Sequence, residues 1–291
     1  MSVKQVEMVL APREPHYVGD GFRVHNYIPS GYGLTMQRMD PFIMLDYASK
    51  FHFPPSPYKP KGVGVHPHRG FETVTIAYKG SVAHHDSGGG GGVIEEGDVQ
   101  WMTAASGVLH KEYHSENFSK TGGDFQMVQL WVNLPAKDKM SAPKYQAIEN
   151  ASIPKVPIEN GYVEVIAGEF QGTKGKASTF TPVHLFNAHL QSGGKAEFSF
   201  PADYNTCIIV VEGEIRINDA EEHVPVDHFV LFENEGETIH IEATEHSKIL
   251  ILSGEPIREP IASHGPFVMN TRQEIMQAFH DFEAGKFGEL D

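Results

Sequence analysis

The chain has 291 residues, enough for one large domain or two ordinary ones, each with a core of its own. Hydrophobic residues make up 40% of it and charged residues 21%, and no window approaches the run of about eighteen apolar residues that a membrane span needs. Its 38 acidic and 23 basic residues give a formal net charge of −15, which repels phosphate backbones and anionic lipids, so neither direct nucleic-acid binding nor membrane binding is expected.

The N-terminus and the cysteine count bear on location and chemistry. The segment MSVKQVEMVLAPREP lacks the unbroken apolar stretch of a signal peptide, so we expect an intracellular protein, cytoplasmic or, in a eukaryote, also nuclear. Cys207 is the only cysteine and lies in the apolar run CIIVVEG, which predicts a buried side chain and excludes a thiolate-rich metal or redox site. Any metal site must therefore be built from carboxylates and the 17 histidines.

Strand signals dominate the chain. Alternating or β-branched runs recur at the spacing of a sandwich or barrel; in chain order they are ETVTIAYKG, FQMVQLWVNL, EVIAGEF, CIIVVEGEIRI, HFVLFE, TIHIEA and KILILSG. One helix is predicted near the end, where Thr271 and Glu274 form a capping box and apolar residues follow at helical intervals before Gly285. We expect this helix to pack back on a barrel in an otherwise all-β fold.

The two halves of the chain look like diverged copies of each other. The runs AYKGSVAH and EEGDVQWMTAASGVLHKE in the first half match VVEGEIRI and PVDHFVLFENEGETIHIE in the second. Aligning Asp98 with Asp227 also brings Gly107 onto Gly236, because both intervals are nine residues. The sequence therefore predicts two β-barrels in tandem.

A connector separates the two halves. The stretch 135–157 is rich in Pro, Lys and Ser and is interpreted as a connector rather than as core. The predicted division is a first barrel at 1–134, the connector at 135–157, and a second barrel at 158–291 that ends in the helix.

Two short motifs in the first half predict a metal site. His66-Pro67-His68 lies just before a strong strand, and an extended chain puts residues i and i+2 on one face, so both imidazoles can point into one barrel. His110 and Glu112 have the same spacing and can add an imidazole and a carboxylate from a second strand. Such a donor set suits a first-row divalent ion and leaves two neighbouring octahedral positions for substrate or O₂. A lone His-x-His pair is often only a polar strand end, but the second motif argues against that interpretation.

The polar run that follows the first strand has two interpretations. His84, His85 and Asp86 could line the mouth of the site or lie in solvent, and solvent or structural roles are favoured because such residues are usually exposed unless paired. The glycine run 88–92 is not followed by Lys-Ser/Thr or a helix start, so it is interpreted as a hairpin tip rather than a phosphate loop.

The second half repeats the His-x-Glu pattern out of register. Counting from the matched glycine, Ile239 and Ile241 take the places of the first-half imidazole and carboxylate, one residue away from His240 and Glu242. A one-residue slip turns a strand side chain to the opposite face, so His240 and Glu242 should point away from the interior of that barrel. We expect no metal in the second barrel.

Several motifs together resemble the pirin family of the cupin superfamily: HPHRGFETV, GDVQWMTA, SGVLH, QLWVNL and the late GPFVMNT. The resemblance runs from about Phe22 to the C-terminal helix and implies two tandem barrels of the double-stranded β-helix, or jelly-roll, type. It also implies an N-terminal iron site whose ligands are His66, His68, His110 and Glu112. Fe(II) is the expected ion, with Ni, Cu, Mn and Zn as alternatives, because copper or nickel can outcompete iron at such ligands in vitro.

Glu72 has two interpretations under this resemblance. In many cupins a glutamate four residues after the His-x-His pair is a metal ligand, and Glu72 occupies that position. Pirin-like proteins use the later glutamate instead, here Glu112, which leaves Glu72 to support the site by a hydrogen bond. Glu112 and Glu72 are both candidates for the catalytic base.

The resemblance implies two classes of function. The first is a quercetin 2,3-dioxygenase-type enzyme that cleaves a flavonol or related aromatic substrate with O₂ and releases carbon monoxide, with Glu112 or Glu72 receiving the hydroxyl proton. The second is a non-enzymatic regulator, in which the oxidation state of iron controls binding to a transcription factor or metabolic enzyme through the acidic surface. The enzyme is the preferred hypothesis.

Overall fold

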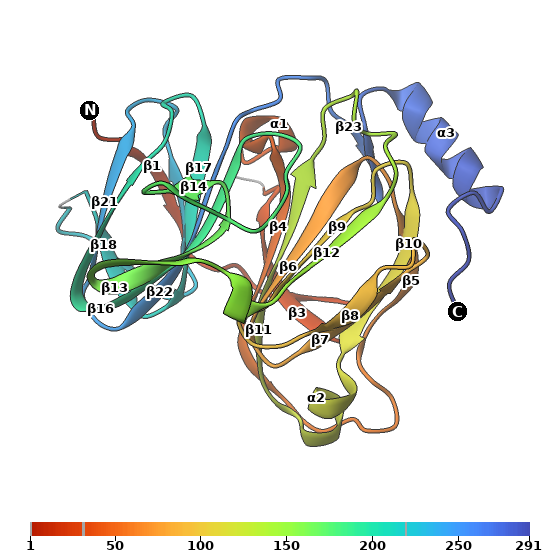
Figure 1. Ribbon diagram of the computed structural model, residues 1–291, viewed down its shortest axis with the longest axis horizontal. Helices are drawn as coiled ribbons and strands as arrows, with labels where there is room; N and C mark the ends of the chain where they lie inside the picture. The colour runs from red at the N-terminus through yellow and green to blue at the C-terminus, as the bar shows by residue number, and fades with distance from the viewer. Residues whose placement is uncertain (1, 31–32, 219) are drawn as a thin grey trace. The chain divides into compact units, whose positions relative to one another are not determined.

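The computed structural model describes residues 2–30, 33–218 and 220–291. The chain divides into two compact units, which are treated separately below (Figure 1). Unit 1 consists of Met1–Arg13 and Ser152–Pro256, and unit 2 consists of Glu14–Ala151 and Ile257–Asp291. Within the described ranges, no helix is long and apolar enough to cross a lipid bilayer.

Unit 2 contains two main antiparallel sheets and a short antiparallel pair, β23 (Ala262–His264) with β24 (Phe267–Met269). The larger has seven strands, in the order β12 (Lys144–Ile148), β9 (Val99–Thr103), β6 (Phe71–Lys79), β11 (Gly123–Asn133), β4 (Phe42–Phe53), β3 (Phe22–Ile28) and β2 (His16–Val18). The smaller has four, in the order β5 (Gly62–His68), β10 (Val108–His114), β7 (Val82–Asp86) and β8 (Gly91–Ile94). Two short helices, α1 (Met36–Met39) and α2 (Glu116–Thr121), connect strands of this unit.

The interior of unit 2 lies between its two sheets. An apolar cluster there includes Phe22, Phe53 and Phe125 from the larger sheet and Val82 and Ile94 from the smaller one. Along β10, buried and half-buried residues alternate strictly, as expected of a strand with one face on a core. Every second residue of β10 therefore points inward.

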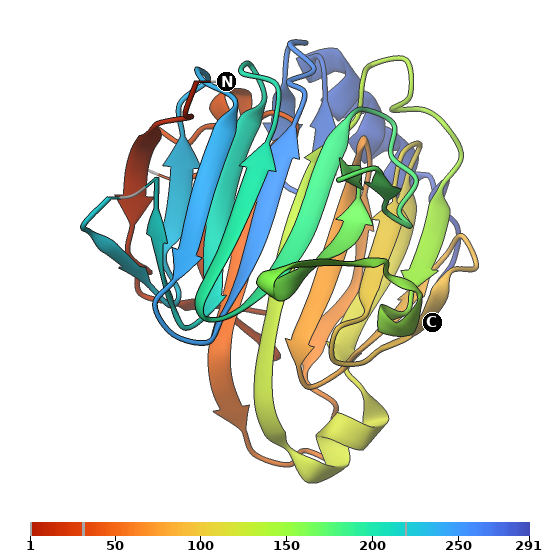
Figure 2. The ribbon, with the colours of Figure 1, turned by 60° about the vertical axis from the view of Figure 1, so that its left-hand side comes forward.

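Unit 1 is built around one large antiparallel sheet system. Its path runs β1 (Val6–Leu10), β20 (Phe229–Phe232), β17 (Asn205–Glu212), β22 (Ser247–Gly254), β16 (Val183–Ser199), β21 (Thr238–Ala243), β18 (Glu214–Ile217) and β19 (His223–Pro225), and β13 (Lys155–Ala167) also pairs with β16. In Figure 2 the green to blue strands of this unit run side by side. The unit also holds the short pair β14 (Glu169–Phe170) and β15 (Thr173–Lys174), and a 3₁₀ turn, η1 (Asn150–Ser152), lies at its boundary.

The interior of unit 1 is apolar. Ile239 and Ile241 of β21 lie in its hydrophobic core, together with Phe186, Phe198 and many β-branched residues. His240 and Glu242 point outward, as predicted from the register. They pair with surface groups, His240 with Glu197 at 3.4 Å and Glu242 with Arg216 at 2.9 Å.

The predicted division at 1–134, 135–157 and 158–291 assigns both ends of the chain to the other unit from the one in which they lie. Strand β1 belongs to unit 1, where it pairs with β20, although it precedes all of unit 2 in sequence. The last segment, with strands β23 (Ala262–His264) and β24 (Phe267–Met269), belongs to unit 2. Part of the connector is strand β12, which extends the larger sheet by pairing with β9. These are pairings between distant segments, for which local sequence carries no signal.

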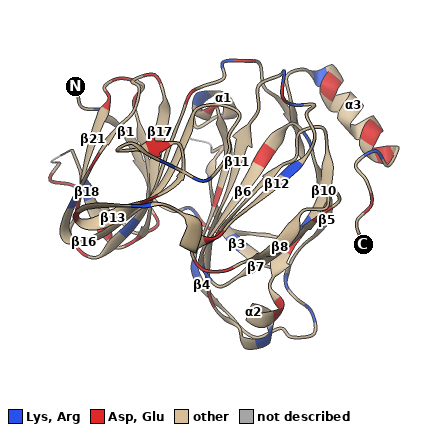
Figure 3. Cartoon of the chain, viewed as in Figure 1, with Lys and Arg blue, Asp and Glu red and all other residues tan. Residues whose placement is uncertain are grey.

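The predicted C-terminal helix is α3, Arg272–Glu283, and it packs on unit 2. Thr271 and Glu274 form the expected capping box. In Figure 3 the helix is basic at its start and acidic further along, and its buried side includes Ile275 and Ala278. Asp281, also on the buried side, accepts a hydrogen bond of 2.8 Å from the buried guanidinium of Arg69. The helix is thereby tied to the residue that follows His68.

We expect Asp281→Asn to destabilise the protein by about 2 kcal/mol, because the buried Arg69 guanidinium loses its carboxylate partner. Hydrogen bonds from Lys286, Arg69 and Gln277 hold the pKa of Asp281 well below its usual value. A carboxyl with a depressed pKa in the folded state contributes its full stability at neutral pH and loses it as the pH falls below about 4. Thermal melts should therefore show a gap between wild type and variant at pH 7 that shrinks in acid. Equal melting temperatures at pH 7 would contradict this role.

Candidate metal centre

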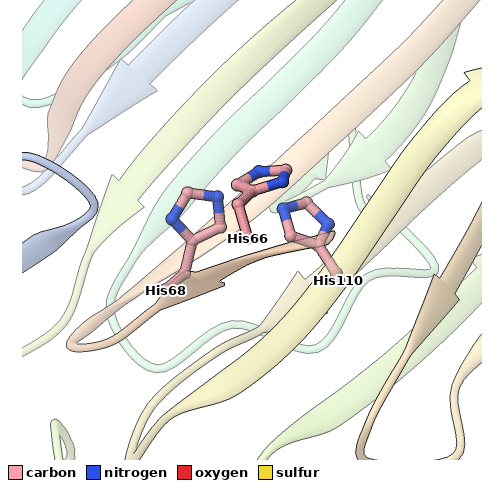
Figure 4. Close-up of side chains that lie close together, drawn as sticks. All are labelled: His66, His68 and His110. Atoms are coloured by element: carbon pink, nitrogen blue, oxygen red, sulfur yellow. The ribbon is translucent and has the colours of Figure 1, made fainter. Parts of the chain in front are cut away.

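Three imidazoles converge inside unit 2. His66 and His68 come from β5 and His110 from the neighbouring β10, where the backbone of His110 pairs with that of His66 (Figure 4). The ring centroids lie 4.2 Å apart for His66 and His110, 4.7 Å for His68 and His110, and 4.8 Å for His66 and His68. One nitrogen of each ring lies within 4.8 Å of the others. The structure thus brings together the three predicted histidines.

The hydrogen bonds of these rings leave nitrogen lone pairs available for a metal. Nδ1 of His66 lies 2.8 Å from the carbonyl oxygen of Gly64, and Nδ1 of His68 lies 3.3 Å from that of Pro266. Because a carbonyl oxygen only accepts, Nδ1 carries the proton in both rings and Nε2 keeps its lone pair. Nε2 of His110 is buried and has no hydrogen-bond partner among the described residues. An orphaned buried nitrogen beside two further imidazoles fits a divalent metal ion.

Burial keeps the inner histidines neutral, which is the form that binds metals. Desolvation, together with the nearby His66, lowers the pKa of His68 to about 3. Desolvation and the neighbouring histidines also lower the pKa of His110 well below its usual value. Both rings therefore stay deprotonated at neutral pH.

Glu112 lies beside this cluster, next to His110. It is buried, and its Oε1 accepts a hydrogen bond from Nε2 of Gln100. The hydroxyl oxygen of Thr75 lies 3.2 Å from the same Oε1. One carboxylate oxygen of Glu112 and one ring nitrogen each of His84 and His110 lie within 4.8 Å of one another. His110 therefore belongs both to this group and to the three-histidine group. Gln100 and Thr75 belong to the larger sheet and reach across the interior to hold a carboxylate of the smaller one.

Of the favoured solvent or structural roles, solvent exposure was wrong for His84 and Asp86, which are buried in the same interior, whereas His85 is exposed. Nε2 of His84 lies 3.0 Å from Oδ2 of Asp86, and its Nδ1 lies 3.5 Å from Nδ1 of His110. Since a carboxylate only accepts, His84 donates from Nε2 and accepts at Nδ1. His110 then donates from Nδ1, which leaves its Nε2 free of a proton. This carboxylate–histidine–histidine chain fixes the metal-binding form of His110.

Of the glycine run 88–92, residues 88–90 lie in the turn between β7 and β8, as predicted, and the last two glycines begin β8. The turn also surrounds the Asp86 carboxylate. The backbone N–H groups of Gly88 and Gly90 each donate to Oδ1 of Asp86 at 2.8 Å. Burial by itself would raise the pKa of Asp86, but the hydrogen bonds from His84 and from these amides leave it lower than usual. A Cβ at Gly90 would lie 2.3 Å from Oδ2 of Asp86 and 2.6 Å from Cβ of Tyr145. Glycine is required there for lack of space.

Glu72 does not join the cluster. Its Oε1 accepts a 2.6 Å hydrogen bond from the hydroxyl of Thr103, and burial raises its pKa to about 7. Thr75, an odd number of residues further along β6, points at Glu112, so Glu72 faces the opposite side of the sheet. Strand β5 ends at His68, and a turn at Gly70, with φ of +93°, separates it from β6. The alternation of side-chain direction along β5 therefore does not predict the direction of Glu72.

A cavity of about 220 Å³ adjoins the histidines. His66, His68 and Glu112 form part of its wall, and most of the remainder is apolar. The other lining residues are Val18, Phe22, Val24, Met44, Asp46, Val63, Met127, Gln129 and Trp131. The cavity can admit an aromatic molecule to the side of the cluster that the histidines leave open.

Comparisons with known proteins agree with this architecture. The family model described as Pirin matches residues 21–132, and the Pirin C-terminal cupin domain matches residues 185–288. A Pseudomonas aeruginosa protein named "putative quercetin 2,3-dioxygenase" is 46% identical over 287 residues, covering 98% of this chain and 99% of its own. Pirin from Homo sapiens is 36% identical over 292 residues, covering 99% and 95% respectively.

Solved structures give the same picture. A crystal structure of quercetin 2,3-dioxygenase from Acinetobacter baumannii superimposes with a TM-score of 0.92 at 45% identity and covers all of both chains. A bacterial pirin from Escherichia coli in complex with nickel(II) has a TM-score of 0.62 at 19% identity, covering 86% of this chain and all of its own, which supports the fold alone.

We expect His68→Ala to leave a folded protein with greatly weakened affinity for divalent metal, because one of three converging imidazoles is lost. His240→Ala should leave metal affinity unchanged, since His240 faces outward in unit 1. Metal analysis after dialysis, with circular dichroism as a check on folding, measures both. Equal metal loss in the two variants would refute this location of the site.

Asp86→Asn should weaken metal binding by about ten-fold without unfolding the protein, because the amide holds the His84 proton less firmly and loosens the orientation of His110. Titration against a competing chelator measures the affinity. Asp124→Asn is the matched control, since Asp124 is exposed and pairs with His52 at the surface at 3.1 Å. If both variants bind metal equally well, the chain from Asp86 to His110 has no influence on the site.

Proposed function

The chain belongs to the pirin family of the cupin superfamily, and from this premise we propose that it is a metal-dependent dioxygenase of the quercetin 2,3-dioxygenase type. The substrate is a flavonol or a related polyphenol, cleaved with O₂. The observation that carries the proposal is the three-histidine cluster, which opens onto a mostly apolar cavity. The names of the Pseudomonas and Acinetobacter relatives support the same reaction class.

The proposed ligands are His66, His68, His110 and Glu112. Their donor set, three imidazole nitrogens and one carboxylate oxygen, suits Fe(II), with Ni, Cu, Mn and Zn as alternatives. A bound ion of this kind would supply a Lewis-acidic centre, redox-active for every candidate except Zn, at which an electron-rich substrate and O₂ can meet. The hydrogen bonds to Gly64, Pro266 and His84 support the assignment, because they orient the lone pairs of all three rings inward.

Glu112 is the proposed acceptor of the substrate hydroxyl proton. Gln100 donates to its Oε1, so its Oε2 is the oxygen left both for the proposed ion and for the proton of a hydroxyl group in the cavity. Held at one oxygen, the carboxylate loses little freedom when substrate binds. We assign the role to Glu112 rather than to Glu72, because Glu72 faces the other side of its strand.

The cavity wall binds and shields the substrate. Phe22, Met44 and Trp131 offer flat or adaptable apolar surfaces against which an aromatic ring can pack. Packing a ring there displaces water from the site and strengthens the polar interactions around it. Phe71 stacks on Trp131 with ring centroids 4.2 Å apart and fixes the indole in place.

Protein purified without oxygen and loaded with Fe(II) should consume O₂ and release carbon monoxide when quercetin is added. Glu112→Gln should lower kcat by about 100-fold or more, the usual contribution of a positioned base. Glu72→Gln, the matched control, should keep most of the turnover. Metal content is measured in each variant, so that a loss of metal is distinguished from a loss of the base.

The decisive negative result is iron-loaded protein that turns over none of a panel of polyphenols. It would exclude the enzyme and leave the hypothesis of an iron-dependent redox regulator, which stays a prediction. A pull-down with Fe(II) and Fe(III) protein tests that hypothesis, since a partner should be retained in one state only.

A further inference from the structure

The cavity has polar groups on the wall contributed by the larger sheet as well as on the histidine side. Asp46 of β4 and Gln129 of β11 are paired across the two strands, so their side chains lie on the same face. Both line the cavity, and their neighbours on this wall, including Met44, Met127 and Trp131, are apolar. A carboxyl and an amide thus face the cavity side by side within an apolar surround.

Asp46 is held in place by a neutral group. Nδ2 of Asn26 donates to its Oδ1 at 2.8 Å, and the same nitrogen donates to the carbonyl oxygen of Ile28 at 3.0 Å. This hydrogen bond orients the carboxyl, but the neutral amide does not neutralise a negative charge there. A lysine or arginine would neutralise it. Burial accordingly raises the pKa of Asp46 above its usual value, although Asn26 and the charge of His16 act in the opposite direction. A half-buried carboxyl in this setting costs folding free energy. Groups placed at such a cost are typical of sites that recognise a ligand.

Gln129 is oriented by the network that also holds Glu112. The hydroxyl of Thr75 donates to Oε1 of Gln129 at 2.7 Å and also lies 3.2 Å from Oε1 of Glu112. Because the Gln129 oxygen is engaged, its amide nitrogen is the end left to donate toward a ligand. A donor and an acceptor therefore stand next to each other, which matches a hydroxyl group that both donates and accepts.

We propose that Asp46 and Gln129 form a hydroxyl-recognition subsite, which binds a phenolic hydroxyl on the part of the substrate that does not reach the metal ligands. The phenol donates to the Asp46 carboxyl and accepts from the Gln129 amide. The inference rests on the proposed function and specifies the substrate further. Flavonols hydroxylated on the remote ring are preferred over those that lack these hydroxyls.

A phenol fits this subsite better than an amine does. An ammonium group would need an ionised carboxylate and would gain nothing from the Gln129 donor. The apolar neighbours, among them Trp131 and Met44, favour a flat aromatic ring that carries the hydroxyl. A site built to hydrogen-bond a hydroxyl also rejects the analogue without it, because its buried polar groups are then left without partners.

Two probes separate this subsite from the rest of the cavity. Quercetin carries hydroxyls on its outer rings, whereas 3-hydroxyflavone keeps only the 3-hydroxyl group of the flavonol core. Binding is measured with zinc-loaded protein, in which no turnover is expected, by quenching of tryptophan fluorescence, since Trp131 lines the cavity. Wild-type protein should bind quercetin about ten-fold more tightly than 3-hydroxyflavone, the value of one good hydrogen bond.

Asp46→Leu should reduce this preference to less than about three-fold, mainly by weakening the binding of quercetin. The variant should leave zinc content unchanged. Asp46→Asn, which can keep the hydrogen bond from Asn26, provides a second variant should the leucine variant fold poorly, and its preference should also fall. Met44→Leu is the matched control on the same wall and should change the binding of both probes by a similar factor.

The outcomes distinguish the subsite from the reaction. If the folded Asp46 variants keep the wild-type preference, or if wild type binds both probes equally, the subsite is refuted while the dioxygenase stands. If wild type binds neither probe and consumes no O₂ with either when iron-loaded, the proposed function fails and the subsite fails with it.

Discussion

The candidate metal centre depends on the register between strands β5 and β10. Opposite pairing of His66 and His110, combined with two-residue alternation along each strand, places His68 and Glu112 in the same interior. The register shifts between His110 and Glu112, an irregularity of the kind that often re-aims side chains beside functional sites. A slip of one residue would turn the histidines of either strand away from the others, so the site exists only in this register.

The orientation of the candidate ligands depends on contacts with distant parts of unit 2. The ring of His68 is held by the carbonyl oxygen of Pro266 in the C-terminal segment, and the ring of His110 by His84 on β7. Arg69, anchored to Asp281 of α3, fixes the backbone just after His68. Each contact contributes little by itself. Together they preorganise the rings of His68 and His110, which would otherwise be free to turn, and such support typically governs metal affinity.

The two units show how one strand pattern serves two purposes. In unit 2 the inward positions of β10 carry polar groups, which are held by a network that includes Gln100 and Thr75. In unit 1 the corresponding inward positions of β21 carry Ile239 and Ile241, which complete an apolar core. Burial of polar groups is tolerated only where partners satisfy them, and a metal-binding interior needs many such partners. Duplication of the barrel therefore does not imply duplication of the site.

Local sequence determined those features that depend on short-range periodicity: the strands, the capped helix α3, the outward direction of His240, and the convergence of the two histidine motifs. It could not determine features that depend on where the chain turns or which distant strands pair. The turn at Gly70 breaks the alternation between His68 and Glu72, so the cupin pattern that made Glu72 a candidate ligand or base does not bring it to the three histidines. Asp46 became part of the cavity, and His84 part of the hydrogen-bond network around the three histidines, only through pairing between distant strands. Such pairing is set by the packing of whole sheets around one interior, because burial is a property of the assembled fold and not of a segment.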